Sequence, residues 1–326
     1  MTAKRQSKAF ESGKPAVTTL IAAALALGLG GCGSTGKTVP APETEAPKTE
    51  APRAEGDKPF ISGAVTLSRQ KVPDGGLLVI RTKSATEPAA EFEGMTFPFY
   101  PVGAQGSGEW ESLLAVPFDH KPQKAAVKVT AGSSVTEVPF EIVDGGYPSE
   151  KLNVSPRHVN PRKKDLERIN RERAEVGRIY SQISRERLWD KDFILPIPSL
   201  VTSRFGTKRV FNGQMQSFHQ GIDLRAPIGT PIVAPAGGRV VMAKDLFFTG
   251  NTVLIDHGYG LVTLYAHMSK LEVKVGDRVQ PGQKLGLSGM TGRASGPHLH
   301  WGIVINKLKV NPLDFVRKVE FAPTVK

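Results

Sequence analysis

Hydrophobic residues between positions 59 and 145 recur in short runs that alternate with turn-forming residues. The runs include Val65–Leu67, Leu77–Ile80, Ala126–Val129 and Val138–Val143, and Pro73-Asp74-Gly75-Gly76 separates the first two. Short runs of this kind, bounded by turns, are typical of the strands of a β-sandwich. We therefore predict a small β-sandwich-like domain over residues 59–148.

A different period governs residues 161–184. Apolar side chains there are spaced by three, four and seven positions, which predicts an amphipathic helix; they are Leu166, Ile169, Val176, Tyr180 and Ile183. We place this helix as a connector within residues 157–189, a stretch with ten basic and five acidic residues. A patch that binds an anionic polymer is one interpretation. We favour the plainer one, a solvated face with ion pairs such as Glu167 with Arg171.

Strand-like runs and Gly/Pro turns return in residues 190–320. The runs are Ile232–Val233, Val240–Met242, Thr252–Ile255, Leu261–Tyr265 and His300–Ile305. The segment Asp256–Gly260 reads as a hairpin turn between two of them. The expected fold class is mainly β: an N-terminal β-sandwich-like domain, a connecting amphipathic helix and a C-terminal antiparallel β domain.

The N-terminal segment has the features of a secretory signal. Basic residues at positions 4, 5, 8 and 14 precede the uncharged apolar run Val17–Gly30, which is short for a membrane span of ~20 residues. The run ends in Leu29-Gly30-Gly31-Cys32, and Cys32 is the single cysteine of the chain. This segment resembles a bacterial lipoprotein signal. The resemblance implies removal of residues 1–31 and attachment to a membrane through a lipidated Cys32.

Residues 32–58 read as a disordered tether, because they are rich in Pro, Glu, Thr and Ala and lack hydrophobic periodicity. Gly33, rather than an aspartate, follows the cysteine. By the rule for enterobacterial lipoproteins this favours the outer membrane, facing the periplasm. We expect a protein of the cell envelope.

Composition narrows the class of protein further. The 326 residues are 39% hydrophobic and 23% charged, with Gly 34 and Pro 25, which excludes a collagen, a coiled coil and a multi-span membrane protein. One cysteine excludes an intramolecular disulfide and cysteine-rich zinc modules. The net charge of +12 suggests an anionic partner. Behind a lipoprotein signal this partner is not expected to be a nucleic acid. The oligomeric state is open, with a monomer as the default.

Four histidines and one aspartate in residues 190–320 form a candidate metal site. His219 and Asp223 lie four apart, and Gly221 between them argues for an extended segment or loop. His267 follows a strand expected to end at Tyr265. His298 and His300 would project from one face of a strand, because alternate strand residues share a face. Imidazole and carboxylate ligands with one position open to water are typical of catalytic zinc. We interpret His257, in the expected turn, as structural.

The same segment resembles the lysostaphin-type (LytM) zinc metallopeptidases. The resemblance rests on His219-x-Gly-Ile-Asp223, Gly-Thr-Pro-Ile-Val-Ala-Pro at 229–235, Tyr265-Ala-His267, Gly-Pro-His298-Leu-His300-Trp and the upstream Ser203-Arg204-Phe205-Gly206. It implies that His219, Asp223 and His300 bind Zn²⁺, and that His267 and His298 are catalytic without binding it. It also implies hydrolysis of peptide crosslinks in bacterial peptidoglycan.

Our mechanistic hypothesis makes His298 the general base and His267 the stabiliser of the oxyanion. Some family members have a tyrosine shortly before the first ligand, but residues 211–218 contain none. The expected bond is D-alanyl–diaminopimelate in a Gram-negative cell, with a pentaglycine-type bridge as the alternative. Two other functions remain open: a non-catalytic activator of wall amidases and a lipid-anchored wall-binding module.

Overall fold

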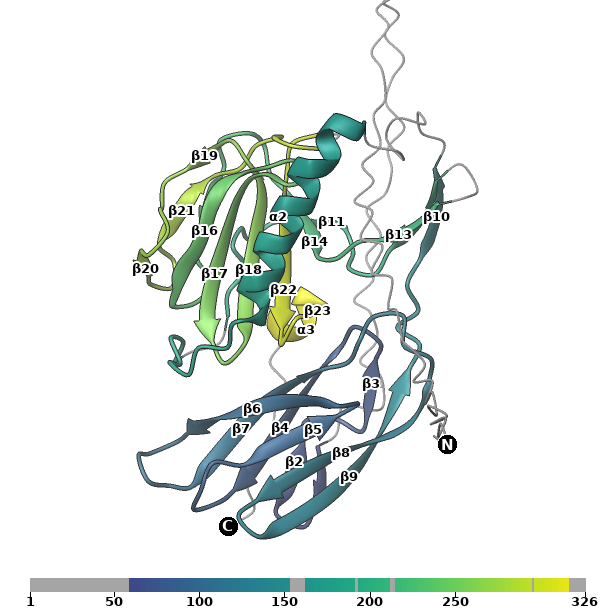
Figure 1. Cartoon of the computed structure of the whole chain (residues 1–326), viewed down its shortest axis with the longest axis vertical. Coiled ribbons are helices and arrows are strands. Elements are labelled where there is room, and N and C mark those ends of the chain that lie inside the picture. The colour runs from purple at the N-terminus through teal and green to yellow at the C-terminus, as the bar shows by residue number, and fades with distance from the viewer. Residues whose placement is uncertain (1–58, 153–161, 191–192, 212–214, 295, 317–326) are drawn as a thin grey trace, which may run out of the picture.

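The computed structural model describes residues 59–152, 162–190, 193–211, 215–294 and 296–316, which form two β bodies and a helix, α2 (Figure 1). The expected fold class, mainly β with an N-terminal sandwich and a C-terminal antiparallel domain, is confirmed. The signal, Cys32 and the whole tether lie outside the described residues. No helix in the described part of the chain is both long and apolar enough to cross a membrane.

The N-terminal body is a strand sandwich in the order β1-β2-β4-β7-β6-β5-β8-β9-β3. β6 joins its two layers, because Met95–Pro98 pair with β5 and Phe99–Val102 pair with β7. Leu78, Phe97 and Leu114 are fully buried between the layers. The strands are β1 (Phe60–Ser62), β2 (Val65–Leu67), β3 (Lys71–Pro73), β4 (Leu77–Lys83), β5 (Ala89–Phe92), β6 (Met95–Val102), β7 (Glu109–Ala115), β8 (Gln123–Ala131) and β9 (Ser134–Val143).

A small sheet follows the sandwich in the chain. β10 (Ser149–Leu152) pairs in parallel with β12 (Lys208–Phe211), which pairs antiparallel with β13 (Met215–Phe218). The strand β13 ends one residue before His219. The last strand of the N-terminal segment therefore shares a sheet with the strand that leads into the candidate site.

The C-terminal body is built on the sheet β11-β14-β22-β18-β17-β16-β20, with β23 paired to β22, and on the sheet β15-β21-β19. Its strands are β11 (Val201–Ser203), β14 (Ile222–Arg225), β15 (Pro231–Val233), β16 (Gly238–Leu246), β17 (Gly250–Gly258), β18 (Leu261–Met268), β19 (Lys270–Leu271), β20 (Arg278–Val279), β21 (Lys284–Leu287), β22 (His298–Ile305) and β23 (Leu308–Val310). The short helix α3 (Pro312–Val316) follows β23.

The helix α2 (Lys163–Ser181) lies across one face of the larger sheet of the C-terminal body (Figure 1). Val176, Ile179 and Tyr180 pack on an apolar cluster of that sheet, which consists of Met242, Leu246, Leu254, Val262 and Val304. The set of apolar residues predicted for the buried face of the helix is wrong at both ends. Leu166 precedes the first buried residue of the helix, Ile169, and is exposed. Ile183 follows the end of the helix and is also exposed.

The polar face of α2 is tied down by ion pairs that differ from the expected ones. Arg168 pairs with Glu172 within the helix and with Asp245 on β16, and Lys244 pairs with Glu175. Glu167 and Arg171 form no ion pair in the described structure. Charged residues on β16 pair with the helix residues that face the sheet, while Glu167 and Arg171 are exposed to solvent.

The two bodies pack against each other as one unit. Asn306 donates its side-chain amide to the Thr96 carbonyl at 2.8 Å, and the Asn311 backbone amide donates to the Gly75 carbonyl at 2.9 Å. The rings of Tyr100 and Trp189 meet edge to face at 5.1 Å. Buried residues of both bodies form one continuous core. The sandwich is thus fixed to the C-terminal body at the β22–β23 end.

Candidate metal and catalytic site

Neighbouring strands bring Asp223 and His300 together. β14 and β22 are antiparallel, and their register sets Asp223 directly opposite His300. Ile222 and Leu224, on either side of Asp223, are fully buried in the core. Alternation along the strand therefore turns the Asp223 carboxylate to the opposite face, toward α2. Leu299 is likewise buried, so the imidazoles of β22 share the face of Asp223.

His219 reaches the same point from the loop before β14. The chain can fold back so tightly because position 221 is glycine. A Cβ on Gly221 would collide with the Trp301 carbonyl oxygen and lie 2.9 Å from the Cε1 atom of His300. The sequence reading of Gly221 as a residue outside any helix is correct, but the structure adds a steric reason that the sequence does not contain.

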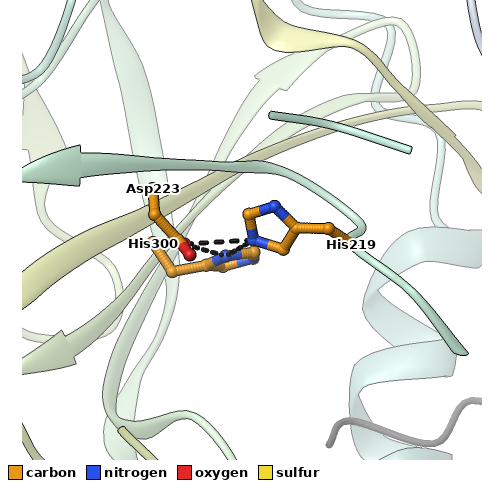
Figure 2. Close-up of side chains that lie close together, drawn as sticks. All are labelled: His219, Asp223 and His300. Atoms are coloured by element: carbon orange, nitrogen blue, oxygen red, sulfur yellow. Dashed lines mark hydrogen bonds and ion pairs between the residues drawn. The ribbon is translucent and has the colours of Figure 1, made fainter. Parts of the chain in front are cut away.

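Three ligand atoms converge in Figure 2. His219 Nε2 lies 3.0 Å from Asp223 Oδ1 and 2.9 Å from His300 Nδ1, and His300 Nδ1 lies 3.0 Å from Asp223 Oδ1. His219 Nδ1 lies 2.9 Å from the carbonyl oxygen of Arg204, which can only accept a hydrogen bond. This bond assigns the proton of the neutral ring to Nδ1 and leaves a lone pair on Nε2, directed at the other two atoms.

The electrostatics of this trio favour an ionised Asp223 beside a neutral His300. Burial alone would raise the pKa of Asp223, but the His219 and His300 rings beside the carboxylate hold this pKa well below its usual value. Burial lowers the pKa of His300. Neutral imidazole and ionised carboxylate are the states in which these side chains ligate metals.

The trio fits a zinc ion. Among the described residues, His219, Asp223 and His300 each offer one ligand atom, and these three atoms all lie within 4.8 Å of one another. Tetrahedral ligands at 2.0–2.2 Å from zinc would be about 3.4 Å apart. The observed separations need to widen by only a few tenths of an ångström. The lone pair on His219 Nε2 faces the Asp223 carboxylate oxygen at 3.0 Å, and a cation would relieve the repulsion between them.

His267 is aimed at this trio by an irregularity in β18. The pairing of β17 with β18 shifts between Asn251 and Val253, so that β18 holds one extra residue. His267 has a φ of 62°, which is uncommon for a residue other than glycine. Such a bulge re-aims the side chain. The strand also continues to Met268, which corrects the expectation that it ends at Tyr265.

His267 and His298 form a pair beside the ligand trio. Their ring centres are 4.8 Å apart, and His298 Nε2 lies 3.7 Å from Asp223 Oδ1. Nδ1 of His267 contacts the Thr291 carbonyl and Nδ1 of His298 contacts the Gly296 carbonyl, both at 2.8 Å. In the neutral tautomer that these contacts select, the lone pair of each ring is on Nε2. Burial, together with the nearby His300 and His298, lowers the pKa of His267 to about 3.

Comparisons with known proteins agree with this arrangement. The family model of peptidase family M23 matches residues 217–312. The chain is 45% identical over 95 residues to peptidoglycan DD-endopeptidase ShyA and 41% identical over 114 residues to peptidoglycan DD-endopeptidase ShyC, both of Vibrio cholerae. These matches cover 29% and 34% of this chain but only 22% and 26% of the relatives.

One solved structure extends the likeness beyond that segment. A crystal structure described as a peptidase M23 from Pseudomonas aeruginosa is 32% identical, with a TM-score of 0.60, over 75% of this chain and 94% of its own. The chain belongs to peptidase family M23. All five residues expected for the M23 site lie on one face of the β14–β22–β18 sheet or in the loop beside it.

His257 has a structural place in the M23 domain, although not the expected one. It belongs to the strand β17 rather than to the turn, and it is fully buried. Nδ1 lies 2.6 Å from the Gly237 carbonyl, and Nε2 lies 2.8 Å from the hydroxyl of Thr263. Burial lowers its pKa to about 4. His257 thus links three segments of the M23 core as a neutral ring.

The M23 site opens into a cavity of about 190 Å³. All five site residues line it, and so do Phe248, Leu264, Gly302, Val304 and Lys309. The helix α2 supplies one wall through Ile169, Glu172, Arg173, Val176 and Tyr180. None of the described lining residues comes from the N-terminal sandwich. Sequence analysis predicted the helix from its period but not its place beside the histidines, since periodicity says nothing about what a helix faces.

Proposed function

We propose that this protein is a zinc endopeptidase that hydrolyses peptide crosslinks of bacterial peptidoglycan. The observation that carries the proposal is the convergence of His219 Nε2, Asp223 Oδ1 and His300 Nδ1 within 3.0 Å of one another, beside a second pair of histidines. Membership of the M23 family supports a peptidase. The named relatives from Vibrio cholerae support peptidoglycan as the substrate.

His219, Asp223 and His300 would hold the zinc ion. When bound, zinc polarises the scissile carbonyl and makes a water molecule a stronger acid and nucleophile. His298 is suited to act as the general base, because its Nε2 lone pair lies on the side of Asp223. After accepting the proton from water, the same nitrogen can return it to the leaving amine.

The hydrogen bonding of His267 constrains its role. With Nδ1–H donated to the Thr291 carbonyl, Nε2 of the neutral ring is an acceptor and cannot donate to an oxyanion. The low pKa of the ring means that it is neutral before substrate binds. His267 can therefore stabilise negative charge only after it has taken up a proton during the reaction. Both histidines enter the cycle as bases.

The D-alanyl–diaminopimelate crosslink is our proposed bond, in keeping with the DD-endopeptidase names of the relatives. The decisive experiment incubates the purified protein with isolated peptidoglycan, with and without a chelator, and identifies the released peptides by mass. We expect the loss of crosslinked dimers and gain of monomers, abolished by the chelator and restored by zinc. Binding of the protein to peptidoglycan without cleavage would instead identify a wall-binding module. Cleavage only after an amidase is added would identify an activator.

We also propose that a lipidated Cys32 anchors the protein in the cell envelope, on the periplasmic face of the outer membrane. The support is the Leu-Gly-Gly-Cys segment and the position of the single cysteine. Replacing Cys32 with serine removes the acyl acceptor, so the protein should leave the membrane fraction. Continued membrane association of that variant would identify the uncleaved apolar run as the anchor instead.

A further inference from the structure

The cavity extends from the histidines along the β22 strand to a lysine that the proposed chemistry does not use. Lys309 on β23 stands opposite Val304, four residues along β22 from His300. Four residues of strand span about 13 Å. Gly302 lies between the two on the same face, and the nearest atom to a Cβ built there is 3.4 Å away. The absence of a side chain at Gly302 keeps the path between the two ends open.

The ammonium group of Lys309 has no acidic partner in the described structure. The lysine is partly buried and lines the cavity, yet it forms no ion pair or hydrogen bond through its side chain. The described acids of the cavity wall are engaged elsewhere. Glu172 pairs with Arg168 and accepts the Phe247 amide, and Asp223 belongs to the ligand trio. The other cation of the wall, Arg173, adds to the positive charge.

Tyr180 of α2 is a second polar group at this end. It packs on the cluster that contains Val304, and its hydroxyl has no hydrogen-bond partner in the described structure. Burial lowers the pKa of Lys309 to about 8, a value at which the amine is still mostly protonated at neutral pH. A partly buried ammonium and a phenol hydroxyl at one end of a cavity are a donor set for an anion.

We infer that Lys309, with Tyr180, binds a carboxylate of the peptide substrate and makes the enzyme selective for acidic stem peptides. The inference rests on the proposed function. The span of about 13 Å along β22 corresponds to roughly three or four residues of an extended substrate peptide between the scissile bond and that carboxylate. Fewer residues are needed where a long side chain carries the carboxylate. A diaminopimelate residue is of this chemical kind, because its side chain ends in a second carboxylate.

The test compares two synthetic crosslinked stem peptides, one with free carboxylates and one with the same groups amidated. The unaltered protein should cleave the free acid with a kcat/KM about ten- to hundredfold higher, the worth of a charge-assisted hydrogen bond. Lys309→Met keeps the length of the side chain and removes its charge. It should bring the ratio between the two peptides close to one, mainly by raising KM for the free acid. Tyr180→Phe should lower the ratio by a smaller factor.

Lys307→Met is the matched control, because Lys307 is exposed in the turn between β22 and β23. It should retain the full preference for the free acid. A preference unchanged by Lys309→Met would overturn the inference while leaving the endopeptidase proposal intact. If neither peptide is cleaved by the unaltered protein, the proposed function fails. The inference is then judged by calorimetric binding of the free-acid peptide to the zinc-free protein, where equal affinity of Lys309→Met would refute it.

Discussion

Asp223 and His300 face each other directly across two antiparallel strands, with Oδ1 of the aspartate 3.0 Å from Nδ1 of the histidine. The relationship depends on the register of β14 against β22, and a slip of one residue would turn one of the two side chains into the core. Ile222, Leu224 and Leu299, all fully buried, resist that slip. These buried neighbours of the ligand residues thus maintain the geometry of the site.

Loss of a ligand should therefore remove metal without unfolding the protein. We expect Asp223→Ala and His300→Ala to lose more than a hundredfold in zinc affinity, measured as metal content after dialysis against a zinc buffer. The free energy of unfolding of the metal-free protein should change little, because the shared core remains. His120→Ala, a histidine of the sandwich that pairs with Glu93, serves as the control and should keep its zinc. A normal zinc content in His300→Ala would remove that residue from the ligand set.

His298 and His300 are two residues apart on one face, yet their alanine variants should differ in kind. His298→Ala should retain zinc near one per chain while activity falls by roughly 10²–10⁴-fold, the usual contribution of a positioned general base. His300→Ala should lose both. Metal analysis and peptidoglycan cleavage of the same preparations separate the two. Should His298→Ala lose zinc while His300→Ala keeps it, the two roles are exchanged.

Gly221 should not tolerate even a methyl group. The Cβ of Gly221→Ala would press on the Trp301 carbonyl and the His300 ring, so His219 and His300 must move apart. We expect about 1–3 kcal/mol lower stability and a marked loss of zinc affinity. Gly296→Ala is the control at the same site, since a Cβ there meets nothing within 4 Å. Equal zinc binding by both variants would contradict this account of the ligand loop.

Buried His257 should make stability fall in acid. Its pKa is lowered to about 4 in the folded protein, against about 6.5 in the unfolded chain. The unfolded state therefore binds more protons between these values, so this contribution is complete above pH 6.5 and is lost as the pH falls toward 4. The expected loss is about 3 kcal/mol. Urea unfolding of metal-free protein across this range should show it, and His257→Asn should flatten the curve. Parallel curves for the two proteins would rule out His257 as the source.

Local patterns were enough to predict the strands and the ligand face. Alternation in His298-Leu299-His300 placed both imidazoles opposite the core, and turn residues marked the hairpin of β17 and β18. The orientation of His267 was out of reach, because a bulge arises from the pairing of distant strands. The same holds for the Arg204 carbonyl that fixes the His219 tautomer. The wall formed by α2 also depends on where a helix docks, which its own sequence does not encode.

The extra residue in β18 has a consequence for stability. Deleting one position at Ala266 or His267 would restore an unbroken hydrogen-bond ladder with β17 and relieve a backbone conformation that only glycine adopts freely. The same deletion would remove a histidine from the cavity. A one-residue deletion here should therefore give a more stable protein that lacks the proposed activity. The irregular strand thus exchanges some stability for the position of one imidazole.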